Sequence, residues 1–439
     1  MVIGIRREDK NEWERRIPLV PSDLKELKNK YGINAVIQPS KIRCFTDDDF
    51  ISNDLEINED LGKANTVFAV KEIPLHYFQK GNTYMFFAHV IKGQSYNMKM
   101  LRKMMELECN LIDYERVVNE QNQRLIFFGR YAGTAGMLET LHLFGQKLKL
   151  EGYKTPFEKI KQPYQYASIN EAKADLEKIS QEIKAGGLPA KLTPIVFGFA
   201  GYGNVSKGAQ EIFDILPHKI IPAEMLPRLH DSLTLDTSNV YKVVFKEEDM
   251  VQRKDRQPFE RQEYFNQPEL FESVFENYIP FLSSIVNCIY WTEKYPRLVT
   301  KDYILNKYAK QSRQKLKVIG DISCDIDGSI ELTYKVTKPD NPAFTFAITD
   351  GSFKDGVQNK NGITIMAVDN LPCEFPVESS TEFSSVLKNY VKEIVSADFN
   401  KEFEELELTY PIKKALILHK GKLTQDYQYL NSFLNQEEK

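Results

Sequence analysis

The sequence predicts an α/β protein built from two doubly wound domains. Its 439 residues exceed what one ordinary hydrophobic core supports. Short apolar runs alternate with segments of helical periodicity, and parallel strands need such long connections. In addition, a glycine turn joins an apolar run to an amphipathic helix in the stretch "IVFGFAGYGNVSKGAQEIF", at residues 195–213.

The first alternating block predicts a mainly parallel sheet. Residues 21–32 are typical of a helix that Ser22 caps and Gly32 ends. Arg124 precedes a short apolar run, 125–128, that predicts one more strand. The other expected strands are the apolar runs at residues 2–8, 34–40, 66–74, 83–90 and 110–115.

The second block starts after two expected helices, at residues 134–153 and 170–194, the first long enough to connect two domains. Residues 267–291 also predict a helix. The last segments, 380–397 and 409–421, predict helices with no strand, which can pack back on the first domain. Strands are expected at residues 195–200, 218–224, 239–245, 315–323 and 363–372.

Composition and charge argue against several classes of protein. A formal charge of -4 favours neither nucleic acid nor a membrane surface as partner. No apolar run approaches the roughly 20 residues that span a bilayer, and charge follows the first residues at once, so no signal peptide is expected. The five cysteines form no CxxC pair, which argues against a disulfide framework and a zinc site. We therefore expect a soluble, cytoplasmic enzyme without a metal.

The glycine turn predicts a dinucleotide site. Gly201 lets the strand turn sharply, and Gly203 lets the backbone approach a pyrophosphate at the helix N-terminus. Ser206 stands where a third glycine is usual, and its small side chain still allows close packing. Tyr202, between the two glycines, is bulky for a glycine turn and is expected to alter how the cofactor binds. The expected cofactor-binding residues are Gly201, Gly203, Asn204, Val205, Ser206 and Glu224.

The choice between NAD and NADP normally rests on the residue that ends the second strand. Glu224 lies close to the usual distance of about 20 residues and can hold both ribose hydroxyls, which favours NAD. Arg228 and His230 follow closely and can instead meet a 2′-phosphate. All three also suit a solvated surface, so the residues alone leave this choice open.

Two proton-transfer groups follow successive expected strands. Lys71 ends the run "FAVK" and His89 ends "MFFAH", and carboxyl ends of parallel strands face the ligand crevice. A partly desolvated lysine and a histidine both suit acid–base work near neutral pH.

Charged groups that suit an acid or amine substrate accompany them. Arg16 and Arg124 can bind carboxylates through paired hydrogen bonds. Glu72 and Glu115 can face an ammonium group. Glu12 and Arg15 are assigned to the surface. Asp321 ends a strand of the second block, where it can orient cofactor or substrate.

Several of these residues, among them Arg16, Lys71 and His89, belong to motifs that resemble one enzyme family. The stretches "RREDKNEWERRIPLVP", "VKEIP", "FFAHVIKGQ", "FGRYAGTAGM", "GYGNVSKGAQEIF", "DISCDIDGSIE" and "VDNLP" resemble lysine–2-oxoglutarate reductase, also called saccharopine dehydrogenase (lysine-forming), a relative of alanine dehydrogenase. The resemblance runs from about residue 3 to the C-terminus. The segment 343–356 departs from the family pattern, and no role is assigned to it.

The resemblance implies a reaction, a role for each candidate residue and two domains. The ε-amine of lysine condenses with 2-oxoglutarate, and a nicotinamide hydride reduces the imine to saccharopine, with NADPH favoured because fused family members commonly use it. Lys71 and His89 match the family's acid–base pair, and Arg16 its carboxylate-binding arginine. Glu72, Glu115, Arg124 and Asp321 match positions that line the site. A substrate-binding domain at 1–130 and 376–439, a Rossmann-like dinucleotide domain at 131–375 and an active-site cleft between them are expected.

Two other functions are compatible with the sequence. One is an amino-acid dehydrogenase of the alanine dehydrogenase type, which uses ammonia instead of lysine. The other is a dinucleotide sensor without catalysis, which the presence of Lys71 and His89 disfavours. A homo-oligomer is compatible with either enzyme.

Overall fold

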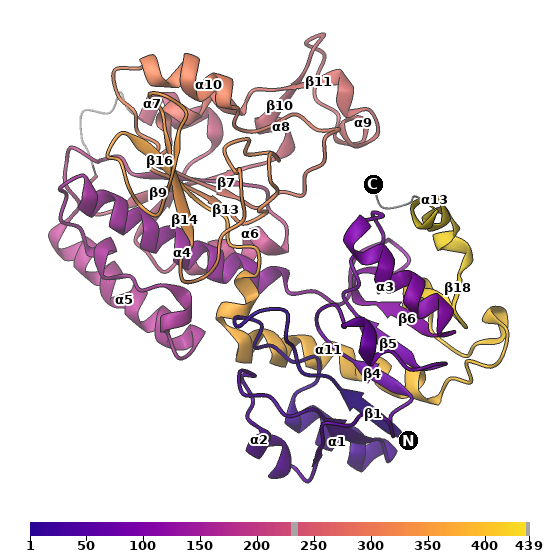
Figure 1. Cartoon of the computed structure of the whole chain (residues 1–439). Helices are drawn as coiled ribbons and strands as arrows, with labels where there is room; N and C mark the ends of the chain where they lie inside the picture. Colours follow the sequence, from indigo (N-terminus) through magenta and orange to yellow (C-terminus); the bar gives the residue numbers. More distant parts are fainter. Residues whose placement is uncertain (230–235, 436–439) are drawn as a thin grey trace. The chain divides into compact units, whose positions relative to one another are not determined.

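The computed structural model describes residues 1–229 and 236–435, and it divides into two units. Residues 1–128 and 376–439 form the first unit, and residues 129–375 form the second (Figure 1). Each unit contains an eight-stranded, mainly parallel sheet, so the α/β fold class is confirmed. Within the described ranges, no helix combines the length and hydropathy that crossing a membrane requires.

The first unit has a sheet in which β1 to β6 are parallel and two antiparallel strands extend one edge. Its strand order is β18-β17-β6-β5-β4-β1-β2-β3. The strands are β1 Val2–Ile5, β2 Asn34–Ile37, β3 Glu56–Ile57, β4 Thr66–Phe68, β5 Thr83–Phe86, β6 Asn110–Asp113, β17 Leu416–His419 and β18 Lys422–Leu423.

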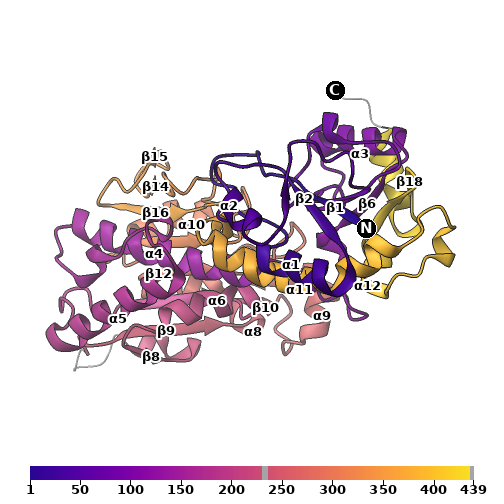
Figure 2. The ribbon, with the colours of Figure 1, turned by 90° about the horizontal axis from the view of Figure 1, so that it is seen from below.

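Helices from both ends of the chain pack on this sheet. The helix α11 runs beside α1 in Figures 1 and 2, and the Lys388 ammonium on α11 binds Asp23 on α1 at 2.8 Å. The buried core of the unit also mixes residues from both ends, for example Ile5 and Leu387. The helices are α1 Pro21–Tyr31, α2 Asp47–Ile51, α3 Ser95–Glu106, α11 Pro376–Ser396, α12 Tyr410–Ala415 and α13 Asn431–Leu434.

Three local predictions for this unit are wrong. Val20, not Ser22, is the N-cap of α1, because Pro21 with its fixed φ occupies the first helical position; Gly32 ends the helix with φ of 65°, as expected. No strand forms at 125–128, where the chain has only an isolated bridge at Arg124. The segment 409–421 is not purely helical, because its fully buried run "LILH" forms β17. The helix prediction failed here since so short an apolar run does not distinguish helix from strand.

The second unit has a sheet with the order β15-β14-β16-β13-β12-β7-β9-β8, of which all but β14 and β15 are parallel. The divergent segment 343–356 forms the β14–β15 hairpin at the sheet edge. The strands are β7 Val196–Ala200, β8 His218–Ile220, β9 Val240–Phe245, β12 Ser284–Asn287, β13 Val318–Asp321, β14 Ala343–Ala347, β15 Phe353–Asp355 and β16 Gly362–Met366, with a separate pair of β10 Val251–Arg253 and β11 Phe271–Ser273.

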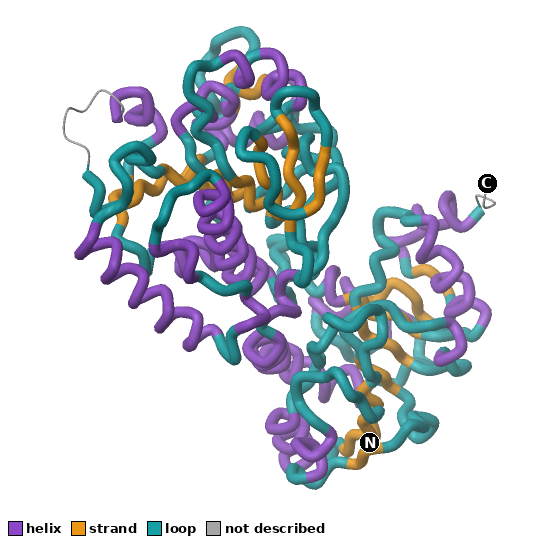
Figure 3. The backbone as a smooth tube through the Cα atoms, turned by 60° about the vertical axis from the view of Figure 1, so that its left-hand side comes forward, coloured by secondary structure: helices purple, strands orange, loops and turns teal. Residues whose placement is uncertain are grey.

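Helices and turns cover both faces of this second sheet (Figure 3). Alternate residues of β7 point to opposite cores: Phe197 packs with residues of α4, α5 and α6, and Val196 packs on the other face with Phe275 and Ile304. The helices are α4 Gly129–Leu150, α5 Ile169–Gly186, α6 Asn204–Phe213, α7 Leu226–Leu229, α8 Glu247–Met250, α9 Arg261–Asn266 and α10 Lys301–Asn306.

The long helix expected at 267–291 is absent from the described structure, and this prediction is wrong. Three short 3-10 turns, β11 and the buried β12 occupy the segment instead. Pro280 interrupts the segment. The fully buried run 284–287 is stabilised by hydrogen-bonded pairing with β7 and β13, which helical periodicity does not reveal.

Two buried carboxyl groups make the stability of the second unit depend on pH. Glu139 on α4 and Glu374, which ends a 3-10 turn at Leu371–Glu374, are almost fully buried. Burial raises the pKa of Glu374 to about 8, and burial together with the Glu374 charge raises the pKa of Glu139. Both folded pKa values lie above the unfolded value of about 4.3, so the stabilising contribution of each group is complete below that pH and is lost as the pH rises through its folded pKa, which for Glu374 is about 8.

Replacing Glu374 with glutamine is therefore expected to raise the urea midpoint of unfolding at pH 8 and to change it little at pH 5. The amide keeps the shape and removes the charge that burial disfavours. Urea unfolding at both pH values measures the effect, with exposed Glu177→Gln as the control on the same unit. An equal change at both pH values would contradict the assignment.

Candidate functional site

Lys71 and His89 follow neighbouring parallel strands of the first unit. Strands β4 and β5 pair in parallel, and Lys71 and His89 each come three residues after the last strand residue, Phe68 and Phe86. The chain stays paired beyond the strands, because Phe87 N–H donates to the Val70 carbonyl at 3.0 Å. The two residues that sequence reasoning selected therefore lie side by side in backbone position, at the carboxyl edge of the sheet.

A buried glutamate that the sequence analysis did not select holds the segment before Lys71. Glu8 accepts hydrogen bonds from the backbone N–H groups of Val70 at 2.7 Å and Lys71 at 2.9 Å. Burial, with the charge of Glu14 adding to it, raises the pKa of Glu8 to about 7. Glu8 lies in the motif "RREDK", and its position after the first strand was the available signal. Within the described structure, the Lys71 side chain has no hydrogen bond or ion pair.

His89 has a fixed ring orientation and an unusual backbone conformation. Its Nδ1 lies 2.7 Å from Glu72 Oε1, so the ring donates Nδ1–H to the carboxylate and directs Nε2 away from it. Its φ of 48° is left-handed, and Asn97 Nδ2 donates to the carbonyls of Ala88 and His89 at 2.9 and 3.2 Å. Sequence reasoning missed Asn97, since nothing in "SYNMKM" marks it.

Glu72 stays ionised beside this ring. Burial raises its pKa, but the hydrogen bond and charge of His89, with Lys10, hold the pKa of Glu72 well below its usual range. Lys10 Nζ lies 3.0 Å from Glu72 Oε2. Glu72 is thus the hydrogen-bond partner of His89 in this structure.

Replacing Glu72 with glutamine is expected to lower turnover by about 10-fold or more, within the range of lost acid–base catalysis. The amide can donate as well as accept, so it no longer imposes one tautomer on His89. The ¹⁵N shifts of the His89 ring should change from one tautomer to a mixture. The control is Glu56→Gln, an exposed acid of the same sheet. Lost turnover with an unchanged His89 tautomer would contradict the positioning role.

Arg16 forms a buried ion pair. Its Nε and one terminal nitrogen bind the two oxygens of Glu14 at 2.7 and 2.6 Å, with side chains only 3% and 1% exposed. The guanidinium carbon lies 4.2 Å from the centre of the Phe128 ring. Glu12 and Arg15 are exposed, in agreement with their assignment to the surface.

Glu115 and Arg124 form a second pair at the same edge of the sheet. They are joined by an ion pair, and Glu115 N–H donates to Asp113 Oδ1 at 2.8 Å. Burial raises the pKa of Asp113 to about 7. Arg124 is 47% exposed, so a ligand carboxylate can reach it more readily than Arg16.

A cavity of about 420 Å³ opens among the loops that follow β1 and β2. Glu8, the residue that binds the Lys71 backbone, forms part of its wall. The lining side chains include two cations and two acids, a set that suits a charged small molecule. They are Arg7, Glu8, Pro39, Ser40, Lys41, Ile42 and Asp47.

The glycine turn of the second unit has the geometry that a pyrophosphate needs. Gly201 has φ of 92°, which favours glycine, and Gly203 is the N-cap of α6 with no side-chain cap. A Cβ on Gly203 would meet nothing within 4 Å, and the first turn of α6 carries no acidic residue. Uncapped N–H groups and open space therefore fit the diphosphate of a dinucleotide.

Close packing behind this turn uses glycines that the fingerprint does not include. A Cβ on Gly208 would overlap the Arg130 carbonyl, and one on Gly133 would overlap the Val205 carbonyl. Ser206 is fully buried, and its Oγ accepts from Gln210 Nε2 at 2.9 Å. The contact of α6 with α4 thus takes the place of the usual third glycine.

Glu224 does not end a strand next to the glycine-bearing strand. It lies in a 3-10 turn at Ala223–Met225 after β8, and β8 is the edge strand, with β9 between it and β7. Glu224 and Arg228 are exposed, and His230 lies outside the described residues. The distance of about 20 residues along the chain that suggested Glu224 therefore does not place it beside β7, because spacing along the chain does not determine strand order.

Asp321 is a buried hydrogen-bond acceptor at the end of β13. Its Oδ1 accepts from Asn287 Nδ2 at 2.8 Å and from Cys324 N–H, and its Oδ2 accepts from Thr333 Oγ1 at 2.6 Å. Burial raises its pKa to about 6. These bonds tie β12, β13 and the following loop together at the carboxyl edge that also carries the glycine turn.

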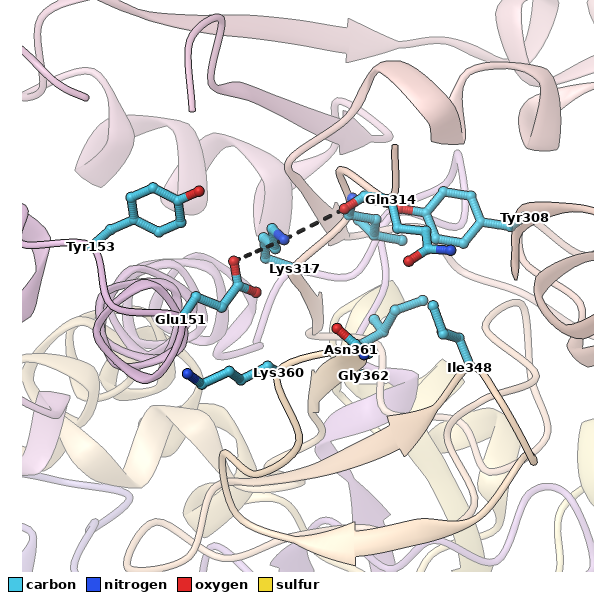
Figure 4. A pocket seen from close by; sticks show the side chains of 11 residues that line it. Glu151, Tyr153, Tyr308, Gln314, Lys317, Ile348, Lys360, Asn361 and Gly362 are labelled. Atoms are coloured by element: carbon cyan, nitrogen blue, oxygen red, sulfur yellow. Dashed lines mark hydrogen bonds and ion pairs between the residues drawn. The ribbon is translucent and has the colours of Figure 1, made fainter. Parts of the chain in front are cut away.

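The cavity of Figure 4 lies at the opposite edge of this sheet. It measures about 260 Å³, and Lys317 and Asn361 line it just before β13 and β16 begin. Glu151 and Lys317 point toward each other there, with 2.9 Å between Oε2 and Nζ. None of the candidate residues lines this cavity.

Fold and site define a two-domain α/β protein with a dinucleotide-type glycine turn. Models of the alanine dehydrogenase/PNT N-terminal domain and C-terminal domain match residues 4–135 and 285–426, together more than half of the chain. The chain therefore belongs to the alanine dehydrogenase/PNT family.

Curated relatives include two longer proteins and one of similar length. The chain is 36% identical to alpha-aminoadipic semialdehyde synthase of Arabidopsis thaliana, over 98% of this chain and 41% of that protein. It is 32% identical to the mitochondrial alpha-aminoadipic semialdehyde synthase of Mus musculus, over 100% and 48%. The chain thus spans less than half of these two relatives. It is 25% identical to saccharopine dehydrogenase [NAD(+), L-lysine-forming] of Emericella nidulans, over 88% and 90%.

Solved structures agree on the fold. An L-alanine dehydrogenase superposes with a TM-score of 0.62 at 16% identity, over 99% of this chain and all of that one. A transhydrogenase from Sinorhizobium meliloti gives a TM-score of 0.54 at 14% identity, over 97% and 100%.

Proposed function

We propose that the protein reduces the imine of L-lysine and 2-oxoglutarate to saccharopine with a reduced nicotinamide cofactor, and catalyses the reverse reaction. The observation that carries this proposal is the pair of proton-transfer groups, Lys71 and His89, on neighbouring strand ends. The relative named saccharopine dehydrogenase [NAD(+), L-lysine-forming], similar over 88% of this chain, supports the choice of reaction.

The chemistry assigns a task to each group. The lysine ε-nitrogen attacks the keto carbon, and water must then leave to form the imine. His89 Nε2 removes one proton from the attacking nitrogen and passes it to the keto oxygen, and Lys71 donates the second proton, so that the oxygen leaves as water and a protonated imine remains. When bound, the nicotinamide supplies the hydride that completes the new C–H bond.

The remaining charged residues bind the substrates. Arg16 and Arg124 bind carboxylates, because guanidinium groups form paired hydrogen bonds with them. Glu115 and Glu72 balance the ammonium charge of lysine. Asp321 and the glycine turn bind the cofactor, with Asn204, Val205 and Ser206 starting the helix that faces the pyrophosphate.

One spectrophotometric assay tests the function. Oxidation of the reduced nicotinamide is followed with 2-oxoglutarate plus lysine, and with 2-oxoglutarate plus ammonia as the control. Turnover with lysine and none with ammonia is expected. Turnover with ammonia alone would replace the proposal with an amino-acid dehydrogenase. Cofactor binding without turnover on a panel of amines and 2-oxo acids would replace it with a sensor.

A further inference from the structure

Two adjoining cavities lie at the amino edge of the second sheet. One is the cavity of about 260 Å³ in Figure 4, and the other measures about 160 Å³. Both are lined by Glu151, Tyr153, Gln314 and Lys317. The glycine turn and Asp321 follow the carboxyl ends of β7 and β13, so these cavities are separate from the dinucleotide site.

Cations outnumber acids in the lining of the two cavities. Among the lining residues that the structure describes, Glu151 is the only acid, and its side chain is 10% exposed. Its Oε2 lies 2.9 Å from Lys317 Nζ, and its Oε1 lies 4.0 Å from Lys147 Nζ, so two cations already share this carboxylate. The cations of the lining are Lys191, Arg313, Lys315, Lys317 and Lys360.

The other lining cations gain little from nearby carboxylates. Within residues 1–229 and 236–435, the side chains of Lys191 and Lys360 have no hydrogen bond or ion pair, and Arg313 donates to the neutral Lys191 carbonyl at 2.8 Å. Lys315 is only 5% exposed. Burial, with the charge of Arg313 adding to it, lowers the pKa of Lys315 to about 7. An anion that enters the cavities therefore meets an excess of positive charge.

Lys317 lies at the centre of this arrangement. Figure 4 shows it between Glu151 and Gln314, whose backbone carbonyl is 3.4 Å from Lys317 Nζ. Because Lys317 lines both cavities, an anionic group in either one can reach its ammonium group. Each cavity is several times larger than the roughly 30 Å³ that a water molecule occupies, which leaves room for one such group.

We propose that the two cavities form a binding site for a small anion that carries two phosphate or two carboxylate groups. One group occupies each cavity, and Lys317 lies between them. The exposed Lys191 and Lys360 bind the outer oxygens through charge-assisted hydrogen bonds. A bound anion thereby links the end of α4 to the segments before β13 and β16 and stabilises the second unit. This site does not depend on the proposed reaction.

Isothermal titration calorimetry of the full chain tests the inference. Pyrophosphate and citrate are titrated at fixed ionic strength in the presence of NADH, which keeps the glycine turn occupied, and acetate serves as an anion with one group. We expect saturable binding of pyrophosphate, citrate or both, and much weaker binding of acetate. Tighter binding of pyrophosphate would identify phosphate groups as the recognised chemistry, and tighter binding of citrate would identify carboxylates.

Two variants locate the bound anion. Lys317→Gln should weaken binding about 10-fold or more, the scale of a lost hydrogen bond to a charged group. The double variant Lys191→Gln with Lys360→Gln should also weaken binding, and it leaves the Glu151–Lys317 ion pair intact if Lys317→Gln proves unstable. The matched control is Lys178→Gln, a lysine of the same unit that is 72% exposed and lines neither cavity.

Three results would overturn the inference. They are a wild type that binds neither pyrophosphate nor citrate, cavity variants that bind as the wild type does, and a Lys178→Gln variant that weakens binding as much as the cavity variants do. Equal binding of acetate would overturn recognition of two anionic groups. Thermal unfolding of each variant excludes a loss of fold as the cause of weaker binding. None of these results depends on turnover, so the proposed reaction stands or fails separately.

Discussion

Replacing Lys71 with methionine is expected to lower turnover by about 10²–10⁴-fold, the usual contribution of a positioned acid or base. Methionine keeps most of the side-chain volume and removes the ammonium group that donates the proton. The backbone N–H of residue 71 still donates to Glu8, so the segment after β4 keeps its anchor. Affinity for the reduced nicotinamide should change little, because the glycine turn belongs to the other unit.

Steady-state kinetics and fluorescence titration of the cofactor measure the two effects separately. Lys80→Met is the control, since Lys80 is an exposed lysine of the same unit, 69% exposed and paired with Glu108. Its turnover should match the wild type. If Lys71→Met weakened cofactor binding and stability as much as it lowered turnover, Lys71 would be a structural residue.

Replacing Arg16 with alanine is expected to destabilise the fold by about 3–5 kcal/mol, the usual cost of removing one member of a buried ion pair. Glu14 is 1% exposed and loses two hydrogen bonds of 2.7 and 2.6 Å. The guanidinium also leaves the face of Phe128. Urea unfolding measures the loss, and exposed Arg15→Ala, one residue away, should change stability by less than about 0.5 kcal/mol.

A double variant separates the two roles of Arg16. Glu14→Gln with Arg16→Gln removes both buried charges, so most of the lost stability should return. The KM for 2-oxoglutarate should nevertheless stay about 10-fold or more above the wild-type value, because the carboxylate has lost a charged donor. Restored stability together with a wild-type KM would remove Arg16 from the substrate site.

The sequence was sufficient to predict features that depend on local chemistry. The left-handed Gly32 and Gly201 occur where spacing and residue type predict them, and Lys71 and His89 each follow a strand, three residues after its end. Features that depend on long-range pairing were not predictable. Residues 416–419 form a strand only because β6 is available to pair with them, and β9 rather than β8 adjoins β7.

The same distinction applies to the candidate site. A pattern of charge marks Arg16 and Glu72, but it does not reveal that Glu14 and His89 are their partners. Glu8 and Asn97 act through backbone groups of other segments, and such contacts leave no periodic signal.

The divided first unit has a consequence for biosynthesis. Ile17 and Val20 donate backbone hydrogen bonds to Ser380 and Ser384, so the amino-terminal segment lacks these acceptors until the ribosome has also made residues 129–375. At roughly 5–20 residues per second, that interval lasts tens of seconds, during which the uncovered β1–β6 sheet is exposed to chaperones and to aggregation. The inserted second unit is contiguous in the chain and can complete its own core first. The first unit then completes its fold last, when the carboxy-terminal segment has been synthesised.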